Sequence, residues 1–488
     1  MRWPRLLTIG ITTLAIAGAA LAGQNTSAEL RKVLTNLPDK SVRCGAMVVD
    51  LQTGKTLVNI NADEQMVPAS NQKLLVMTSA GLYLGQSFAF RTDLMLDGDN
   101  LILVGDGDPS LGDPRIAESM NEQPLDFLGY WAKALVDQGH ANLAGDFIVD
   151  ATVLDEQFVH PDWSDNDLLR WYGAPIGGLN LNDNCVELTA WPGDAGSPAR
   201  WELFPPCSLA QVENRCVSAP GTADATPVIG RRPGTFELVL SGKVGERGTL
   251  QSVPVHEPNR FAAAAIREYL ETQGVHVAGA TRFERVRTPT GELPARPRVI
   301  AEHVTPLPVV LKRIGVNSQN MFAETLFKRL GGADATRRNN AFTPGSWDAG
   351  RLVVQDMLRR MGVDPNEVVI ADASGLSRSN RISAHNLVRI LQYVYASDMR
   401  DMIVHALAGN RNGGTLGARL QKLDADVYAK TGYIRGVRTL SGFVKTTDDK
   451  WYAFSVLFNG FKGGSAPYNR IHDEVCRILA DTAGTPPA

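Results

Sequence analysis

The sequence predicts a mixed α/β (α+β) fold in which one antiparallel sheet, flanked by helices, is interrupted by a long β-rich insertion. Apolar residues alternate on both sides of a short turn near each end of the chain, at 45–60 and 439–461, which is typical of β-hairpins. Residues 304–408 show mainly the spacing of amphipathic helices. Residues 88–290 instead hold short strand-like runs dense in Gly, Pro and Asp. We therefore expect the two chain ends to share one sheet.

The N-terminus has the pattern of a secretory signal peptide. Arg2 and Arg5 precede an apolar run that ends at Ala22 in a small-x-small motif, which predicts cleavage before Gly23. An uncleaved anchor helix is the alternative, but the run contains Gly and Thr and is short for a membrane span. The prediction is a secreted protein, periplasmic or extracellular, without a transmembrane anchor after cleavage of residues 1–22.

The remaining 466 residues (488 minus 22) are too many for one hydrophobic core. We expect a sheet-and-helix domain built from 23–87 and 291–488, and an inserted β-rich region at 88–290. The hydrophobic fraction of 44% and the net charge of −3 are ordinary for a soluble protein. Because no basic cluster, HExxH, CxxC or paired-histidine motif occurs, we expect no nucleic-acid partner, no metal and no cofactor.

Helices are expected where apolar residues recur every three or four positions. One precedes the first hairpin at 27–38, and the middle of the chain holds four more, at 307–314, 320–330, 346–362 and 382–397. The second of these four should stop at Gly331-Gly332, and Ser383 should cap the last. Residues 470–488 predict a short helix with a frayed tail.

Five cysteines in an exported chain raise the question of disulfides. Cys207 and Cys216 lie nine positions apart in a proline-containing loop, and we expect them to close a small ring. Cys44, Cys185 and Cys476 lie in apolar segments, where they are expected to be buried free thiols.

The stretch VPASNQKLLVMTSAGLYLG, at 67–85, places a lysine at the start of an otherwise apolar helix. Ser70 and Lys73 are three apart, hence neighbours on one face, and Pro68 helps to set the helix start. An alkoxide on Ser70 would be stabilised by the free N–H groups there, and a desolvated Lys73 can be neutral and act as its base. The alternative is a capping serine beside an exposed lysine.

Two further short motifs carry groups suited to the same chemistry. Ser318 and Asn320 flank Gln319 at the junction of two predicted helices, where a hydroxyl and an amide can relay a proton and hold a peptide group. Lys430 and Thr431 are followed by a glycine at the expected start of a strand, and offer a cation and a hydroxyl to a carboxylate. Helix capping and an ordinary helix-to-strand turn are the respective alternatives.

The three motifs, Ser-x-x-Lys, Ser-x-Asn and Lys-Thr-Gly, occur together in the order found in active-serine penicillin-recognising enzymes. Ser70 and Ser318 are 248 positions apart (318 minus 70), far more than in class A β-lactamases. The chain also contains LVGDGDPSLG, WYGAPIGGLNLNDN and ADASGLSRSNRIS. In this combination it resembles the D-alanyl-D-alanine carboxypeptidase/endopeptidase family of the PBP4 (DacB) type, peptidase family S13, over nearly the whole mature chain.

The resemblance implies a penicillin-binding transpeptidase-like domain with a five-stranded antiparallel sheet, and an insertion at 88–290 divided into two small β-rich domains. It further implies that Ser70 is the acylated nucleophile and Lys73 the general base, whose pKa the nearby Lys430 lowers by like-charge repulsion. Ser318 and Asn320 would handle the leaving-group proton and the substrate amide.

On the substrate side, the resemblance implies that Lys430 and Thr431 hold the terminal carboxylate. Gly432 would let another backbone approach, and the N–H groups of Ser70 and Tyr433 would form the oxyanion hole. The implied substrates are peptidoglycan stem peptides ending in D-Ala-D-Ala, with β-lactams as covalent inhibitors.

A pocket for a diaminopimelate side chain is implied at Asp167, Tyr172 and Arg378, where an acid and a guanidinium suit an amine and a carboxylate. Solvated surface is the alternative for each. Tyr433 and Arg435 depart from the family pattern, which leaves the balance between endopeptidase and carboxypeptidase open.

Other functions are less well supported by the sequence. A β-lactamase would need a deacylating glutamate, and no suitable loop is present. A catalytically slow penicillin-binding sensor or scaffold ranks second, although all three motifs are intact. An unrelated serine hydrolase is disfavoured because no Gly-x-Ser-x-Gly occurs.

Overall fold

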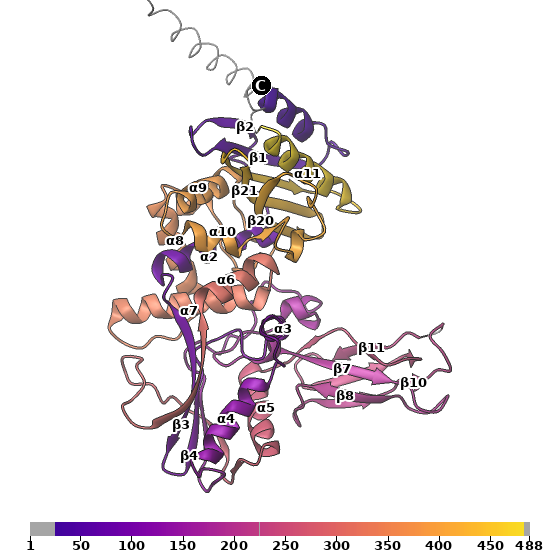
Figure 1. The fold of residues 1–488 in the computed structure, drawn as a ribbon, viewed down its shortest axis with the longest axis vertical. Helices are drawn as coiled ribbons and strands as arrows, with labels where there is room; N and C mark the ends of the chain where they lie inside the picture. Colours follow the sequence, from indigo (N-terminus) through magenta and orange to yellow (C-terminus); the bar gives the residue numbers. More distant parts are fainter. Residues whose placement is uncertain (1–24, 224, 483–488) are drawn as a thin grey trace, which may run out of the picture.

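The computed structural model describes residues 25–223 and 225–482, and the predicted signal peptide lies outside the described residues. The molecule is elongated, with a sheet-and-helix part at one end and the inserted region at the other (Figure 1). The mixed α/β fold class predicted from the sequence is confirmed.

One antiparallel sheet joins the two ends of the chain. Its strand order is β19-β20-β21-β22-β1-β2, and β1 lies between the N-terminal β2 and the C-terminal β22. The sheet therefore has six strands rather than the expected five, because the two-residue β19 adds an edge. Its strands are β1 (Arg43–Asp50), β2 (Thr56–Ile60), β19 (Ala408–Gly409), β20 (Ala425–Ile434), β21 (Val437–Thr446) and β22 (Trp451–Asn459).

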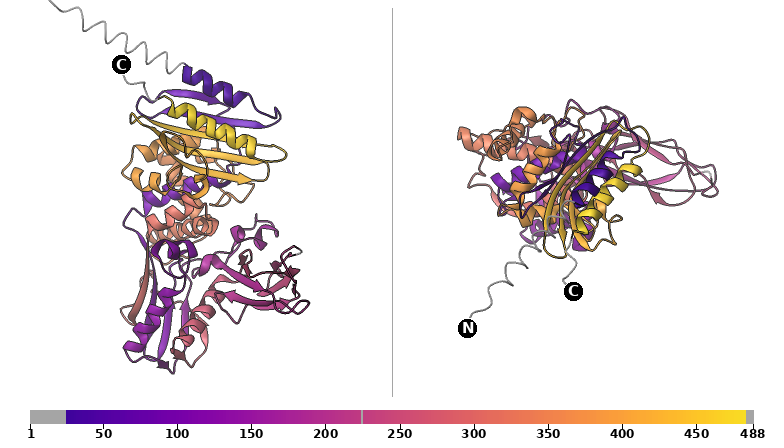
Figure 2. Two further views of the ribbon diagram at one scale, coloured as in Figure 1. Left: turned by 45° about the vertical axis from the view of Figure 1, so that its right-hand side comes forward. Right: turned by 90° about the horizontal axis from the view of Figure 1, so that it is seen from above.

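Helices cover both faces of this sheet. On one face, the helix at 25–35 and α11 lie side by side (Figure 2), and Leu30, Leu34 and Val475 share one apolar core with the sheet. The other face packs on a larger apolar core formed by the remaining helices. The helices are α2 (Lys73–Tyr83), α6 (Leu307–Val316), α7 (Asn320–Asn339), α8 (Trp347–Arg360), α9 (Ala384–Tyr395), α10 (Arg400–Ala406) and α11 (Ala466–Ala480). Ser383 caps α9 as predicted, since its side chain accepts from the Asn386 N–H.

Helix α7 does not stop at the glycine pair, so that prediction is wrong. A Cβ added to Gly331 would lie 2.3 Å from the backbone nitrogen of Gly350 in α8, and one added to Gly332 would lie 2.7 Å from that of Gly345. The two glycines therefore allow α8 and the loop before it to approach α7, and the helix continues to Asn339.

The inserted region contains a mixed five-stranded sheet in the order β17-β6-β4-β3-β18. Its strands are β3 (Ala89–Asp97), β4 (Asn100–Val104), β6 (Phe147–Asp150), β17 (Thr281–Phe283) and β18 (Arg298–Pro306). Helices α4 (Asp126–Asp137) and α5 (Pro258–Thr272) share its apolar core. Because β18 pairs with β3, this sheet includes residues beyond the expected boundary at 290, and the division into domains stays a prediction.

A second group of short strands projects sideways from this sheet (Figure 1). It comprises β7 (Cys185–Trp191), β8 (Arg200–Phe204), β9 (Gln211–Asn214), β10 (Val217–Ser218), β11 (Val228–Arg231), β12 (Glu237–Ser241), β13 (Lys243–Val244), β14 (Gly248–Thr249) and β15 (Val253–Pro254). The inserted region also contains α3 (Pro114–Met120), β5 (Asn142–Leu143), β16 (His276–Val277) and three 3-10 helices, η2 (Asp167–Leu169), η3 (Trp171–Gly173) and η4 (Asn182–Asn184).

The predicted Cys207–Cys216 disulfide is not formed. All five cysteines are free and buried, and these two contribute to separate apolar clusters. Burial raises the pKa of the Cys207 thiol to about 11 and also raises that of Cys216, so both thiols stay protonated near neutral pH. The interpretation of the other three as buried thiols agrees with the structure.

Within residues 25–223 and 225–482, no helix is long and apolar enough to cross a membrane. The same residues include no cluster of three or more potential metal-ligating side chains.

Candidate active site

Ser70 lies in a short 3-10 helix, η1 (Ala69–Gln72), which leads directly into α2. In a 3-10 helix, side chains three apart stand above one another. Lys73 Nζ accordingly donates a hydrogen bond of 3.0 Å to Ser70 Oγ. Ala69 has a positive φ of 46°, a strained conformation for a residue with a side chain, and such strain is typical of functional sites.

Strand β20 approaches the backbone of η1 closely. A Cβ on Gly432 would meet Thr439 Oγ1 at 2.1 Å and the Ser70 nitrogen at 3.0 Å. Thr439 Oγ1 in turn donates to the Pro68 carbonyl at 2.8 Å. The structure thus agrees with the expectation that Gly432 permits a close backbone approach, and Tyr433, half exposed, follows directly on the strand.

Lys73 is fully buried, which contradicts the alternative of an exposed lysine beside a capping serine. Besides Ser70 Oγ, its Nζ donates to Asn320 Oδ1 at 2.6 Å and to the Ser374 carbonyl at 2.7 Å. A neutral lysine has two N–H donors and one lone pair. In neutral Lys73 the two N–H groups can donate to Asn320 Oδ1 and the Ser374 carbonyl. The lone pair then faces Ser70 Oγ, and the Ser70 hydroxyl becomes the donor of that hydrogen bond.

Burial is the main cause that lowers the pKa of Lys73, to about 7, while the charges of Glu324 and Asp372 oppose the shift. The sequence led us to expect that repulsion by Lys430 lowers the pKa of Lys73, and this is wrong, because burial is the main cause. Repulsion between the two lysines affects Lys430 instead: its pKa is lowered well below its ordinary value, first by burial and then by Lys73.

The second and third motifs meet at a hydrogen bond. Lys430 Nζ donates to Ser318 Oγ at 2.9 Å and to the Thr431 carbonyl at 2.9 Å. The motif of Lys430 lies within β20 rather than at a strand start, because the strand already begins at Ala425. Ser318 and Asn320 lie at the junction of α6 and α7, as predicted.

The inserted region also reaches this junction. Asn320 Nδ2 donates to the Tyr172 carbonyl at 2.8 Å, so a residue of the insertion helps to orient the amide whose oxygen accepts from Lys73. The structure therefore brings the three motifs into one hydrogen-bonded cluster.

Of the three residues expected to bind a diaminopimelate side chain, the structure brings two together. Burial raises the pKa of the Tyr172 hydroxyl, and the adjacent Asp167 carboxylate adds to this rise. Arg378 instead donates through Nη2 to the Arg435 carbonyl at 2.5 Å, beyond the end of β20. Arg378 makes no hydrogen bond or ion pair with the other two among the described residues, so the shared pocket stays a prediction.

Sequence reasoning missed a buried carboxylate behind Lys73. Glu324 accepts the Ser374 N–H at 2.7 Å, the Ala373 N–H at 3.1 Å and the Trp347 indole N–H at 2.8 Å. It thereby holds the backbone N–H of Ser374, the residue whose carbonyl accepts from Lys73. Glu324 is four residues after Asn320 on α7, on the same helix face, and this spacing of a charge in an apolar run could have identified it.

No sequence motif identified two other residues of the site, Asp372 and Thr415. Asp372 fastens the same loop by accepting the Gly375 N–H at 2.8 Å and the Ser377 N–H at 2.6 Å. Thr415 lies on the other side of the site and accepts from Thr431 Oγ1 at 2.8 Å.

We expect acylation of Ser70 to depend on pH with an acid limb near pH 7. Lys73 accepts a proton only in its neutral form, so the rate should rise with pH through its pKa of about 7 and then level off. In Glu324→Gln the limb should move to lower pH, because that carboxylate raises the pKa of Lys73. Stopped-flow acylation by a chromogenic β-lactam measures both profiles. Identical limbs in the two proteins would contradict this electrostatic role.

A partly exposed serine bonded to a buried lysine, together with a Ser-x-Asn junction and a Lys-Thr-Gly strand, defines an active-serine enzyme of the penicillin-recognising class. The chain belongs to the D-Ala-D-Ala carboxypeptidase 3 (S13) family, whose sequence model matches residues 26–481. Its class, serine-type D-alanyl-D-alanine carboxypeptidase, agrees with the prediction.

Similar proteins cover most of the chain. It is 30% identical over 514 aligned positions to a D-alanyl-D-alanine carboxypeptidase of Actinomadura sp. (strain R39), covering 98% of this chain and 90% of the relative. It is 26% identical to D-alanyl-D-alanine carboxypeptidase DacB of Haemophilus influenzae, covering 88% and 87%.

The fold is similar to solved structures. The crystal structure of penicillin binding protein 4 (dacB) from Haemophilus influenzae superposes with a TM-score of 0.72 at 23% identity, covering 93% of this chain and 98% of the other. A complex of the same protein with a β-lactam superposes with a TM-score of 0.68 at 22% identity, covering 92% and 99%.

Proposed function

We propose that the chain is a periplasmic or extracellular serine D-Ala-D-Ala carboxypeptidase and D,D-endopeptidase that acts on peptidoglycan stem peptides through a Ser70 acyl-enzyme and is inhibited by β-lactams. The observation that carries this proposal is the 3.0 Å hydrogen bond between Lys73 Nζ and Ser70 Oγ in a site where Lys73 is fully buried. Its relatives named as carboxypeptidases support the substrate class.

In the proposed first step, neutral Lys73 takes the proton of Ser70 while Oγ attacks the carbonyl carbon of the penultimate D-alanine. The negative oxygen that forms is bound by the N–H groups of Ser70 and Tyr433, and each such donor is typically worth about 3 kcal/mol. In this proposal the Ser318 hydroxyl, which accepts from Lys430 at 2.9 Å, gives its proton to the leaving nitrogen as the C–N bond breaks, and protonated Lys73 restores the proton of Ser318. Water then attacks the ester carbonyl, one proton of the water passes through Lys73 to Ser70 Oγ as the ester bond breaks, and the acyl product leaves as a free acid.

The substrate carboxylate is proposed to lie at Thr431. Lys430 is fully buried and already donates to two oxygens, so in this proposal Thr431 contacts the carboxylate directly and Lys430 acts on it at longer range. Thr431 Oγ1 now donates to Thr415 Oγ1 at 2.8 Å and can turn to the substrate instead. When the leaving amine belongs to a second stem, the same steps cut a crosslink.

A side-chain pocket for diaminopimelate at Asp167, Tyr172 and Arg378 remains part of the proposal. It is supported by the proximity of Asp167 to the Tyr172 hydroxyl. We also propose the domain division of 23–87 with 291–488 for catalysis and 88–290 for the insertion.

Digestion of purified muropeptides tests the proposed reaction. We expect release of free D-alanine from pentapeptide monomers and splitting of crosslinked dimers, both measured by liquid chromatography with mass detection. A penicillin pretreatment that acylates Ser70 should stop both. Covalent penicillin binding with no product from either substrate would contradict the enzyme and favour a sensor.

A further inference from the structure

The loop before β7 contains three successive residues in the left-handed region. Asn182, Asp183 and Asn184 have φ values of 50°, 55° and 52°. L-residues normally adopt this conformation singly, and each instance is unfavourable unless its surroundings fix it. Asn184 supplies part of that fixation: its Nδ2 donates to the Pro175 carbonyl at 2.8 Å and to Asn180 Oδ1 at 2.6 Å.

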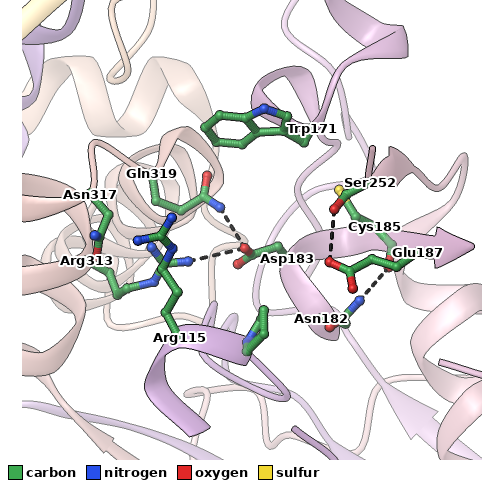
Figure 3. Close-up of a pocket in the computed structure, with 11 residues that line it drawn as sticks. Arg115, Trp171, Asn182, Asp183, Cys185, Glu187, Ser252, Arg313, Asn317 and Gln319 are labelled. Carbon is green, nitrogen blue, oxygen red and sulfur yellow. Dashed lines mark hydrogen bonds and ion pairs between the residues drawn. The ribbon is translucent and has the colours of Figure 1, made fainter. Parts of the chain in front are cut away.

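This left-handed turn directs the Asp183 carboxyl group toward Gln319 and Arg313 (Figure 3). Gln319 Nε2 donates to Asp183 Oδ2 at 2.8 Å, and Arg313 Nη2 donates to the same oxygen at 3.2 Å. Arg313, buried on α6, also donates to Asp113 Oδ2 through Nε at 2.8 Å and Nη2 at 2.5 Å. The contacts lie beside a cavity of ≈ 260 Å³ whose wall includes Trp171 and Arg313.

Gln319 is the middle residue of the Ser-x-Asn motif and is buried itself. Its neighbour Ser318 has a φ of 61°, so the backbone here is also left-handed and needs fixation. Ser318 Oγ accepts from Lys430, and Asn320 Oδ1 accepts from Lys73. Any rotation of the peptide units around Gln319 would therefore displace both hydrogen bonds.

The arrangement retains unpaired polar atoms. Gln319 Oε1 and Asn182 Oδ1 are buried without a hydrogen-bond partner among the described residues. Unpaired buried acceptors and consecutive strained residues both lower stability, and such features concentrate where function depends on them.

We propose that Asp183 is a positioning residue: the left-handed turn of the inserted region holds Gln319, and through it fixes Ser318 and Asn320 for acyl transfer. This inference rests on the proposed Ser70 acyl-enzyme. It makes the insertion a part of the catalytic machinery, in addition to the Tyr172 carbonyl that binds Asn320.

Asp113 offers a matched control, since it shares Arg313 with Asp183 but has no hydrogen bond to Gln319 within the described part of the chain. Asp183→Asn offers a conservative rescue, because its amide oxygen can still accept from Gln319. Burial is the main cause that raises the pKa of the Asp183 carboxyl group well above its ordinary value, and the neighbouring Asp113 adds to this rise.

The test compares second-order rates of acylation by a fluorescent penicillin in five variants, each well below its melting temperature. Asp183→Ala and Gln319→Ala should each slow acylation about tenfold, as expected for loss of one positioning hydrogen bond. The double variant should be no slower than the slower single one. Asp183→Asn should stay within about threefold of the unmodified enzyme. Asp113→Ala should lower the melting temperature without slowing acylation.

Additive losses in the double variant, or equal slowing by Asp113→Ala, would overturn the inference in favour of a general stabilising contact. Unchanged acylation in Asp183→Ala and Gln319→Ala would overturn it as well. If Asp183→Ala does not fold, the acylation rate of Gln319→Ala alone decides: a slower rate supports the inference, and an unchanged rate overturns it. If the unmodified protein is not labelled at Ser70, the proposed function fails; if Ser70 is labelled and the rates do not change, only this inference fails.

Discussion

Ser70→Ala is expected to abolish covalent labelling by a fluorescent penicillin and all release of D-alanine. The change removes the only atom proposed to attack the substrate carbonyl, and the remaining site can bind a peptide without forming an ester. A nucleophile lost from such a site typically lowers kcat by about 10⁶-fold. Gel fluorescence and intact-protein mass after penicillin exposure measure the adduct.

Stability gives the control for this variant. Ser70 Oγ makes one hydrogen bond to Lys73, so its loss should leave the melting temperature nearly unchanged. Ser79→Ala on α2 is a matched substitution, since the Ser79 hydroxyl is buried against Met357 and away from the reacting groups. It should retain labelling. A penicillin adduct that persists in Ser70→Ala would refute the assignment of the nucleophile.

Lys73→Met is expected to slow acylation by about 10³-fold while the protein stays folded. Methionine fills much of the lysine volume but cannot accept the Ser70 proton. It also leaves Asn320 Oδ1 and the Ser374 carbonyl without their donor, at a cost of about 1–3 kcal/mol for each buried acceptor. Stopped-flow acylation measures the rate, and calorimetry shows whether the fold persists.

Two results separate a base from a structural lysine. The residual rate of Lys73→Met should lose the acid limb that Lys73 imposes, because the base that must be neutral for acylation is gone. Lys328→Met is the matched control. Like Lys73, Lys328 is a buried lysine whose pKa is lowered by burial, but it lies on α7 and forms an ion pair with Asp155 at 2.5 Å. A large loss of acylation in Lys328→Met, equal to that in Lys73→Met, would contradict the assigned role.

The parts of the site visible in the sequence were those carried by short motifs. Ser70 and Lys73 could be identified from their spacing of three, and Gly432 from its position directly after a lysine and a threonine. Their convergence was predicted from a family resemblance, and the hydrogen bonds from Lys73 to Asn320 and from Lys430 to Ser318 agree with it. The paired hairpins at the two ends of the chain were predicted from alternation alone and join in one sheet.

What the sequence could not predict depends on contacts between distant segments. Gly331 resembles a helix stop until α8 is seen packed against it. Cys207 and Cys216 are close in sequence, yet they face separate apolar clusters. The pKa of Lys73 is low because Lys73 is buried, in part by a loop that Glu324 holds. Residues close to Lys73 in the sequence do not predict burial by such distant segments. The contact between Asp183 and Gln319 joins residues 136 positions apart.

The pairing of β1 with both β2 and β22 has a consequence for biosynthesis. Strands β1 and β2 are complete once residue 60 has been synthesised, but the second partner of β1 is made only when residue 451 is reached. Until then the N-terminal hairpin presents an open strand edge, and open edges are prone to aggregation. A polypeptide that ends before residue 451 lacks β22, so its β1 has only β2 as a partner and the sheet that carries Lys430 stays incomplete.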